Sequence, residues 1–489
     1  MIKSDNLLNQ SIKKNIMLST VYQIITLITP FITTPYVSRV LGADGIGIYS
    51  FTMSIETYFA MFAALGTISY GTREISRARN NIELRSKVFW EIEILSIITT
   101  SISILIWCLF VSFSDKYQLY FLILTITLAA NLLDISWLFT GLEQLKYIVY
   151  RNIIFRLLSI IALFLLVTEK SDIAMYIGIN AISTFVGAAS MWWSLPKFVH
   201  RVPFSSLQIK RHFRETLVYF IPTIATSVYT VLDKTLIGMI TSDIAENGYY
   251  EQATKIIRMG QTLTFSALNT VLGARISYLF KEKRYEEIQQ RIYKSIDFIL
   301  FMGCLLMFGI IGTANVFVPW FFGQGFEPVA LFMQVMSPII LIIGVSNCLG
   351  SHYYTPAGLR KISAKFIIVG ACFNLVLNLI LIPKYAGLGA IIASLAAELL
   401  ISILYLRNCD GYLTIKILKK CSWKKVVSGL IALAIAYMLQ ESAAELWLVL
   451  IMQSLSIVFV YCAMLIVLKD SSLQYIVALL RIKMINHKV

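Results

Sequence analysis

The sequence predicts an all-α polytopic membrane protein of about 14 transmembrane helices, and composition, block length and charge distribution all lead to this fold class. Of its 489 residues 58% are hydrophobic and 14% charged, and the mean hydropathy is +0.75. An ordinary soluble domain is about 45–50% apolar and about 25% charged, so a soluble globule of this composition could not cover its own surface. The same composition excludes a disordered chain.

The apolar residues come in blocks of roughly 20, the length of helix that crosses about 30 Å of hydrocarbon. We predict the following spans: 15–41, 46–70, 88–112, 117–141, 152–168, 173–195, 214–241, 247–279, 295–317, 328–351, 364–383, 386–407, 425–440 and 446–468. The connections between them are short, and none is long enough to fold as a separate domain. This excludes a membrane-anchored enzyme with an aqueous catalytic module.

Positive charge is sorted between alternate connecting segments. Of the 42 Lys and Arg, 33 lie in one set of alternate segments, 4 belong to the opposite set, and 5 lie within the predicted spans. Such a bias places the basic set in the cytoplasm, so both termini are expected there. The net charge of +15 is therefore explained by topology and by attraction to anionic membrane lipids, and it does not predict nucleic-acid binding.

A weak internal repeat divides the chain. GIY at 47–49 matches GYY at 248–250, and GTR at 71–73 matches GAR at 273–275, at nearly the same offset. Each match falls at the same place on its predicted span. We therefore predict two parallel six-helix lobes around a central cavity, as in transporters with parallel repeats, followed by two extra C-terminal helices.

The domain boundaries follow from this repeat. The N-terminal lobe is predicted at 1–210, the C-terminal lobe at 211–424, and the two extra helices with a cytoplasmic tail at 425–489. Polar groups in lipid are costly, so the cavity between the lobes is where the buried polar residues are expected.

The eighth predicted span has the clearest polar constellation. Glu251, Lys255 and Arg258 are spaced at i, i+4 and i+7, and Asn269 continues the same helical face. Two cations one turn apart suit a polyanionic group, since Arg can hold phosphate oxygens with two hydrogen bonds and Lys adds a point charge. An internal ion pair between Glu251 and Lys255 is the alternative.

Four further charged residues are candidates. Asp233 and Lys234 in the seventh span would contact either the substrate or the eighth span. Arg39, near the outer end of the first span, either contacts an anionic head group at the rim, or extends its charged end to the interface, or pairs with Asp44. Glu56 could bind a proton or Na⁺ and couple transport to an ion gradient, or it is a hydrogen-bonded structural carboxyl. Asp134, Asp297 and Glu398 are expected to be structural.

Several kinds of chemistry find no support in the sequence. There is no GxxxxGK[ST] motif, and the four histidines, including His212, are expected in loops or tails without metal-ligand spacing. No catalytic residues, no metal site and no bound cofactor are predicted, apart from the H⁺ or Na⁺ coupling considered for Glu56. We therefore expect a transporter rather than an enzyme.

SRVLGADGIGIYSF at 38–51, GTREIS at 71–76, LDKTLIG at 232–238 and NGYYEQATKI at 247–256 together resemble the polysaccharide repeat-unit flippases (Wzx-type). These belong to the multidrug/oligosaccharidyl-lipid/polysaccharide exporter superfamily. The resemblance implies a multi-pass protein of the bacterial cytoplasmic membrane that moves undecaprenyl-diphosphate-linked oligosaccharides to the outer leaflet for O-antigen, capsule or exopolysaccharide biosynthesis. It also implies a cationic central cavity.

The resemblance implies that five residues of this chain line the cavity: Arg39, Glu56, Lys234, Lys255 and Arg258. In a symmetric arrangement, cations from both lobes would hold the diphosphate. This chain departs from that arrangement, because the interior of the first lobe is expected to hold no Lys or Arg at mid-membrane depth. Alternating access between the lobes is the expected mechanism, and a polymerase and glycosyltransferases of the same pathway are the expected protein partners.

Three alternative functions remain open. A flippase for the peptidoglycan lipid precursor would have the same architecture. A cation-coupled multidrug exporter would be expected to hold a carboxylate in the first span, and 15–41 contains none. A membrane polysaccharide polymerase would need a substantial external loop with catalytic groups, and the predicted outer connections are about ten residues or fewer.

Overall fold

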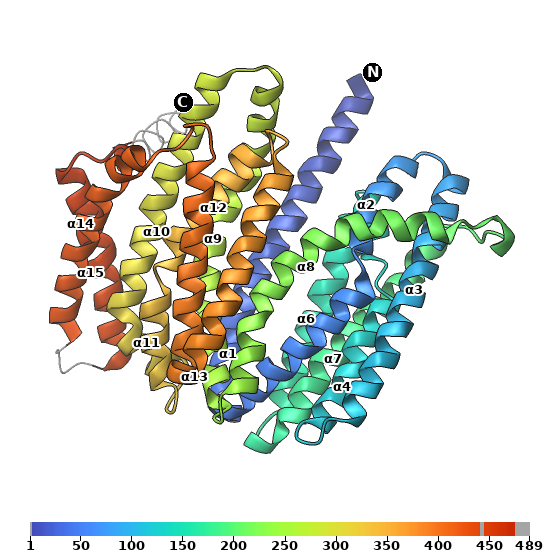
Figure 1. Ribbon diagram of the computed structural model, residues 1–489, viewed down its shortest axis with the longest axis horizontal. Helices are drawn as coiled ribbons and strands as arrows, with labels where there is room; N and C mark the ends of the chain where they lie inside the picture. The colour runs from blue at the N-terminus through green and yellow to red at the C-terminus, as the bar shows by residue number, and fades with distance from the viewer. Residues whose placement is uncertain (1, 441–444, 475–489) are drawn as a thin grey trace. The chain divides into compact units, whose positions relative to one another are not determined.

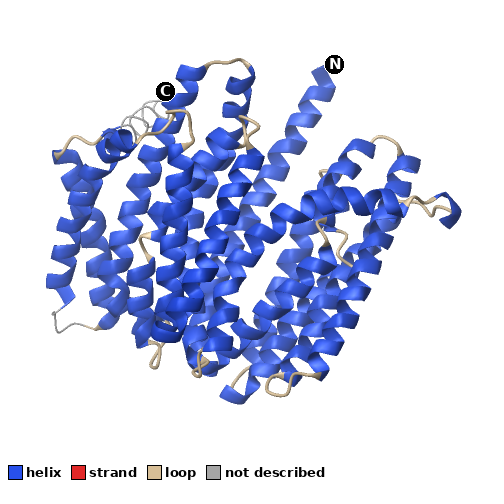
Figure 2. Ribbon diagram, in the orientation of Figure 1, coloured by secondary structure: helices blue, strands red, loops and turns tan. Residues whose placement is uncertain are grey.

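The computed structural model describes residues 2–440 and 445–474, with the side chains of 2–20, 221–230, 263, 266–275 and 440 outside that description. Its secondary structure in these ranges is helical, with short connections and no strand (Figure 2). The α-helices, labelled in Figure 1, are α1 (Ile2–Ala64), α2 (Thr67–Ala78), α3 (Ile82–Ser112), α4 (Gln118–Ala129), α5 (Ser136–Gly141), α6 (Leu145–Leu166), α7 (Ile173–Ser190), α8 (Ile209–Ile240), α9 (Ala245–Lys281), α10 (Tyr285–Phe321), α11 (Glu327–Met336), α12 (Ile339–Leu349), α13 (Arg360–Arg407), α14 (Ile415–Gln440) and α15 (Leu446–Val467).

Ten helical segments within the described residues are long and apolar enough to cross a membrane, which confirms the predicted all-α polytopic class. Two of them are long enough to cross twice. In α1 the helix is interrupted at Gly42, whose φ is 69°, and in α13 at Ala386, whose φ is 47°. Both interruptions lie where the sequence places the junction between two spans. The total of about 14 spans stays a prediction.

The predicted span at 46–70 is wrong at its end, because the helix stops at Ala64. Leu65 and Gly66 adopt positive φ angles of 42° and 77°, and a new helix, α2, begins at Thr67. A Cβ atom at Gly66 would lie 2.9 Å from the main-chain nitrogen of Phe220 in α8. Glycine is therefore required here both by the backbone conformation and by the close approach of α8.

The predicted span at 117–141 is also interrupted. It divides into α4, a 3₁₀ turn (η1, Ala130–Leu132) and the short helix α5. At the interruption the Asp134 carboxylate accepts a hydrogen bond from the Ser136 amide at 3.0 Å, so Asp134 satisfies an otherwise free donor at the start of α5. This agrees with the structural role expected for Asp134.

The chain forms two compact units, Met1–Thr235 and Leu236–Val489. Most of α8 belongs to the first unit, since it packs on α2 and α3 through Gly66, Tyr70 and Glu91. In the second unit α14 and α15 pack against each other and against α10 (Figure 1). The predicted domain boundaries at 210 and 424 stay predictions.

Two glycines permit the tight packing of α2 against α5 in the first unit. A Cβ at Gly71 would lie 2.6 Å from the indole of Trp137, and a Cβ at Gly141 would lie 2.7 Å from the Thr72 carbonyl oxygen. Close approach through small residues is the usual means of helix association in membranes. Gly71 and Thr72 belong to the GTREIS motif, so packing is one reason for that motif.

Candidate functional site

The charged stripe predicted on the eighth span lies on α9. Glu251 and Lys255 are half-buried and Arg258 is exposed. At 1.5 Å per residue, Lys255 is about 15 Å and Arg258 about 20 Å along the helix from Ala245. The helix confirms the spacing that places these three side chains on one face. Two cations are thereby held well inside a 37-residue helix, where lipid contact would be costly.

Asn269 was expected to continue this stripe. The backbone of Asn269 lies within α9, and its side chain lies outside the described residues. The Thr262 hydroxyl donates to the Arg258 carbonyl oxygen at 2.9 Å, which keeps that hydroxyl on the face of Arg258.

On α8, Asp233 is buried, with 4% of its surface exposed, and Lys234 is half-buried. The next residue, Thr235, meets α1: its Oγ1 lies 2.9 Å from Ser54 Oγ and 3.1 Å from the Tyr58 hydroxyl. This hydrogen-bonded contact places the Asp233–Lys234 pair beside the helix that carries Glu56.

Glu56 lies on the other side of α1 from that contact, because residues two positions apart point about 200° apart on a helix. Its side chain is 2% exposed, and its Oε1 has no hydrogen-bond partner within the described residues. An ionised carboxylate in such a position is costly. Glu56 therefore lies on the face of α1 turned away from Thr235.

Arg39 is exposed on α1, three residues before the interruption at Gly42, and Asp44 is exposed two residues after it. This matches the expected place of Arg39 at an end of the first span. Whether Arg39 binds substrate stays a prediction.

One expectation about histidine is wrong. His212 lies within α8, is 3% exposed, and joins a buried hydrogen-bond relay. Its Nδ1 lies 2.7 Å from the Tyr70 hydroxyl, and its Nε2 lies 2.7 Å from Glu91 Oε2. The relay ties α2 and α3 to α8. The sequence offered no signal for it, because Tyr70 and His212 are 142 positions apart and meet only in the folded chain.

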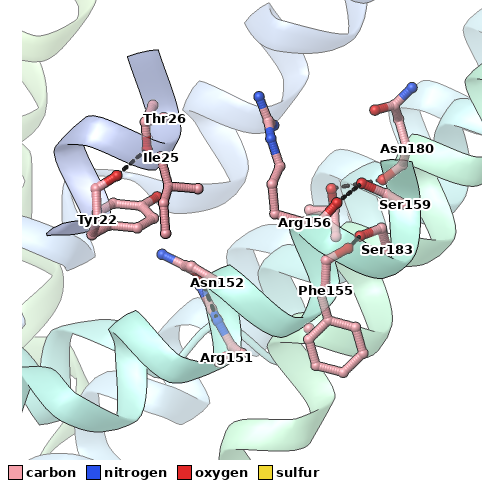
Figure 3. A pocket seen from close by; sticks show the side chains of 12 residues that line it. Tyr22, Ile25, Thr26, Arg151, Asn152, Phe155, Arg156, Ser159, Asn180 and Ser183 are labelled. Atoms are coloured by element: carbon pink, nitrogen blue, oxygen red, sulfur yellow. Dashed lines mark hydrogen bonds between the residues drawn. The ribbon is translucent and has the colours of Figure 1, made fainter. Parts of the chain in front are cut away.

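A polar cavity of about 220 Å³ lies within the first unit, between α1, α6 and α7 (Figure 3). Three helical faces converge on it. Tyr22, Ile25 and Thr26 come from α1, and the residues from α6 and α7 are Arg151, Asn152, Phe155, Arg156, Ser159, Asn180, Ser183, Thr184 and Gly187. Figure 3 shows the Arg156 side chain extended, with the α1 residues on one side and Asn180 on the other.

The cavity holds a cation of the first unit, Arg156, that was not among the predicted site residues. The expectation that the first lobe has no Lys or Arg at mid-membrane depth stays a prediction. Arg156 is the twelfth residue of the 22-residue helix α6 and lines the cavity. A signal was present in the sequence: Asn180, Ser183, Thr184 and Gly187 recur at helical spacing on α7, where an apolar stripe would be expected. Which other helices face this stripe was decided only by the fold.

The structure resembles two classes of solved transporter. The lipid II flippase MurJ in an inward closed conformation has a TM-score of 0.68 at 17% identity, over 92% of this chain and 98% of that one. An inward-facing multidrug resistance MATE family transporter of the MOP superfamily has a TM-score of 0.59 at 12% identity, over 86% of this chain and 100% of that one. At these identities the similarity establishes the fold alone.

Two curated proteins are similar in sequence, and both are described as "Putative O-antigen transporter". The protein from Escherichia coli (strain K12) is 25% identical over 81% of this chain and 97% of its own length. The protein from Shigella dysenteriae is 25% identical over 81% of this chain and 99% of its own length. The model of the family described as "Polysaccharide biosynthesis protein" matches residues 12–280, more than half of the sequence. This multi-pass membrane protein therefore belongs to the polysaccharide biosynthesis protein family.

Proposed function

We propose that the protein is a flippase that moves undecaprenyl-diphosphate-linked oligosaccharide repeat units across the bacterial cytoplasmic membrane, from the cytoplasmic to the outer leaflet, by alternating access. Family membership and the names of both curated relatives support this proposal. The product would be a surface polysaccharide such as O-antigen, and a polymerase and glycosyltransferases of the same pathway would be its partners. No chemical step on the substrate is required, so the proposed role is transport and not catalysis.

The observation that carries the proposal is the pair of cations on α9. Lys255 and Arg258 lie one turn apart on one face, deep within the helix. A diphosphate is a compact polyanion whose oxygens match the two hydrogen-bond donors of a guanidinium. We assign Lys255 and Arg258 to the diphosphate, with Lys234 and Arg39 as further cations along its route.

Physical cost explains why such a protein is needed. Sugar hydroxyls and phosphates cannot cross hydrocarbon without losing hydrogen bonds, at several kcal/mol for each group. A protein route lined with polar groups removes that cost while the prenyl chain stays in lipid. An inside-negative potential favours outward movement of an anion by about 2.3 kcal/mol per charge per 100 mV.

The test removes both cations in cells that depend on this protein for surface polysaccharide. With Lys255→Ala and Arg258→Ala together, lipid-linked repeat units should accumulate inside, and surface polysaccharide should fall at least tenfold. The matched control is Lys281→Ala with Lys283→Ala, which removes the same charge from exposed positions near the end of α9. Undiminished export by the first variant, at equal protein level, would contradict the proposed binding of the diphosphate by Lys255 and Arg258.

We further propose that Glu56 carries H⁺ or Na⁺ during the transport cycle. Its burial and its unpartnered oxygen favour a carboxyl that is neutral or cation-bound over a free carboxylate. Glu56→Gln keeps the shape of the side chain and removes the exchangeable charge. Export by this variant should no longer respond to collapse of the ion gradient, whereas Asp44→Asn, an exposed change on the same helix, should behave as the wild type.

A further inference from the structure

Arg156 occupies an unusual depth in the first unit. It is eleven residues from Leu145 and ten from Leu166, the two ends of α6. At 1.5 Å per residue its Cα lies about 16.5 Å and about 15 Å from these two ends, and it lies inside the span predicted at 152–168. A guanidinium that faced lipid within a span would be costly, so the surroundings of Arg156 require an explanation.

The two faces of α6 supply that explanation. One face is apolar and exposed, as expected for lipid contact; its residues are Ile154, Leu157, Leu158, Ile161 and Leu165. Asn152, Arg156 and Ser159 lie on the opposite face and line the cavity. Because residues advance by 100° along a helix, the charge points away from lipid and into the space between α1 and α7.

Within the cavity, the two arginines differ in how they are held. Arg151 is braced: its Nε and Nη2 donate to Asn152 Oδ1 at 2.9 and 2.6 Å, and its Nη1 contacts Met191 Sδ at 2.7 Å. The Arg156 guanidinium has no hydrogen-bond or ion-pair partner among the described side chains. Its donors therefore face the cavity and remain available to a ligand.

The rest of the lining determines which ligand fits. The lining includes no Asp or Glu. Asp134, which is outside the lining, interacts electrostatically with Arg151, so Arg156 is the cation that has no carboxylate partner among the described residues. The hydroxyls of Ser159, Ser183 and Thr184 donate to main-chain oxygens at 2.8, 3.1 and 2.8 Å, which leaves their oxygen lone pairs as acceptors. The cavity thus combines a free cationic donor with acceptors for hydroxyl groups, as a phosphorylated sugar would require.

The volume of the cavity limits how much of a ligand it can hold. A cavity of about 220 Å³ is smaller than the roughly 300–1,000 Å³ that holds a drug-sized molecule, so it suits one head-group moiety. The phosphate of a resident bilayer lipid lies at the interface, whereas a transported lipid-linked sugar brings its phosphate into the span as it crosses. Both sources present the same phosphate chemistry to Arg156, so competition between them has to identify the ligand.

We propose that the cavity between α1, α6 and α7 is a second binding site, in which Arg156 contacts the phosphate of a polyprenyl-linked sugar phosphate during its passage. The identity of this ligand rests on the proposed flippase function. The phosphate chemistry of the cavity rests on Arg156 and its surroundings alone, so the two can be tested apart.

The experiment measures binding of a fluorescent polyprenyl diphosphate to the purified full-length protein in nanodiscs of neutral lipid. Inorganic diphosphate and phosphatidylglycerol serve as competitors that represent free phosphate and ordinary lipid head groups. Arg156→Gln should weaken binding at least tenfold and Arg156→Lys less, because Lys keeps the charge but has no planar pair of donors. The matched control is Lys146→Gln on the first turn of α6, outside the cavity, which should leave the affinity unchanged.

The outcomes separate the two proposals. If the wild-type protein binds the polyprenyl probe tightly and Arg156→Gln binds it with the same affinity, the proposed second site is overturned. The flippase proposal is not affected by that result. Binding of inorganic diphosphate or phosphatidylglycerol, measured directly on the same nanodiscs and lost in Arg156→Gln, without binding of the polyprenyl probe, would support the phosphate site and contradict the flippase substrate. Absence of all binding by the wild-type protein overturns both. If Arg156→Gln does not fold, Asn180→Leu replaces a polar residue of α7 that lines the cavity and should weaken binding of the probe to a similar extent.

Discussion

Lys425 is buried to 0% exposure, and its Nζ donates to the Asp297 carboxylate at 2.7 Å. The same ammonium donates to Asp470 at 3.0 Å and to the Cys421 carbonyl oxygen at 2.8 Å. This joins α14 to α10 and to the turn after α15 through a single cation. The structural role expected for Asp297 agrees with this geometry. Lys425 stands at the start of the span predicted at 425–440, and the structure shows it as a buried ion-pair partner.

Lys425→Ala should strongly destabilise the second unit. Removal of the ammonium leaves two buried carboxylates facing each other, and loss of one partner of a buried ion pair typically costs about 3–5 kcal/mol. Thermal unfolding of the purified protein should show a clearly lowered Tm. Lys424→Ala is the control, because Lys424 is half-buried and has no ion-pair partner among the described residues: its Nζ donates to the Lys469 carbonyl oxygen at 3.0 Å and lies over the Trp423 ring. Equal melting of the two variants would contradict the assignment.

His212→Ala should loosen the attachment of α8 to α2 and α3. It leaves the Tyr70 hydroxyl without its partner and the buried Glu91 carboxylate with one bond fewer. Each unsatisfied buried group costs about 1–3 kcal/mol. Limited proteolysis should cut near residues 200–212 faster than in the wild type. His200→Ala, at an exposed position before the same helix, provides the comparison and should not change the cutting rate.

Gly71→Ala should destabilise the first unit by about 1–3 kcal/mol, the range for overpacking of a tight interface. The added Cβ would lie 2.6 Å from Trp137, which is 1% exposed and has no room to move. The control is Gly309→Ala in α10, where no atom lies within 4 Å of the added Cβ. There the helix should be unchanged or slightly more stable. An equal Tm loss at both sites would contradict the Trp137 contact as the cause, because helix propensity favours Ala over Gly at each position.

The orientation in the membrane has its own test. Lys283 follows α9 and Gln324 follows α10, and both are exposed at opposite ends of α10. In a cysteine-free background, Lys283→Cys should react with an impermeant maleimide only after the cells are permeabilised. Gln324→Cys should react in intact cells, because the positive-inside distribution places it outside. The reverse pattern would place both termini on the outer side.

The sequence alone was sufficient for the fold class and the spacing of charge on individual helices. A block of apolar residues must be helical in lipid, since no water is present to satisfy a free backbone. The helical period then places Glu251, Lys255 and Arg258 on one face without any tertiary knowledge. The interruptions at Gly42 and Ala386 lie where two apolar blocks meet, so they too were predictable.

Tertiary structure decided which helices face each other, and with this which polar groups became a site. Tyr70, Glu91 and His212 form a relay only because α8 packs on α2 and α3. Arg156 was visible in the sequence as a charge within an apolar span, yet its meaning depended on α1 and α7 closing a polar cavity around it. Periodicity within one helix is a local property of the chain, whereas partners more than a hundred residues away are selected by packing. For this reason the sequence determined the elements and their polar faces, and only the fold decided how those faces pair.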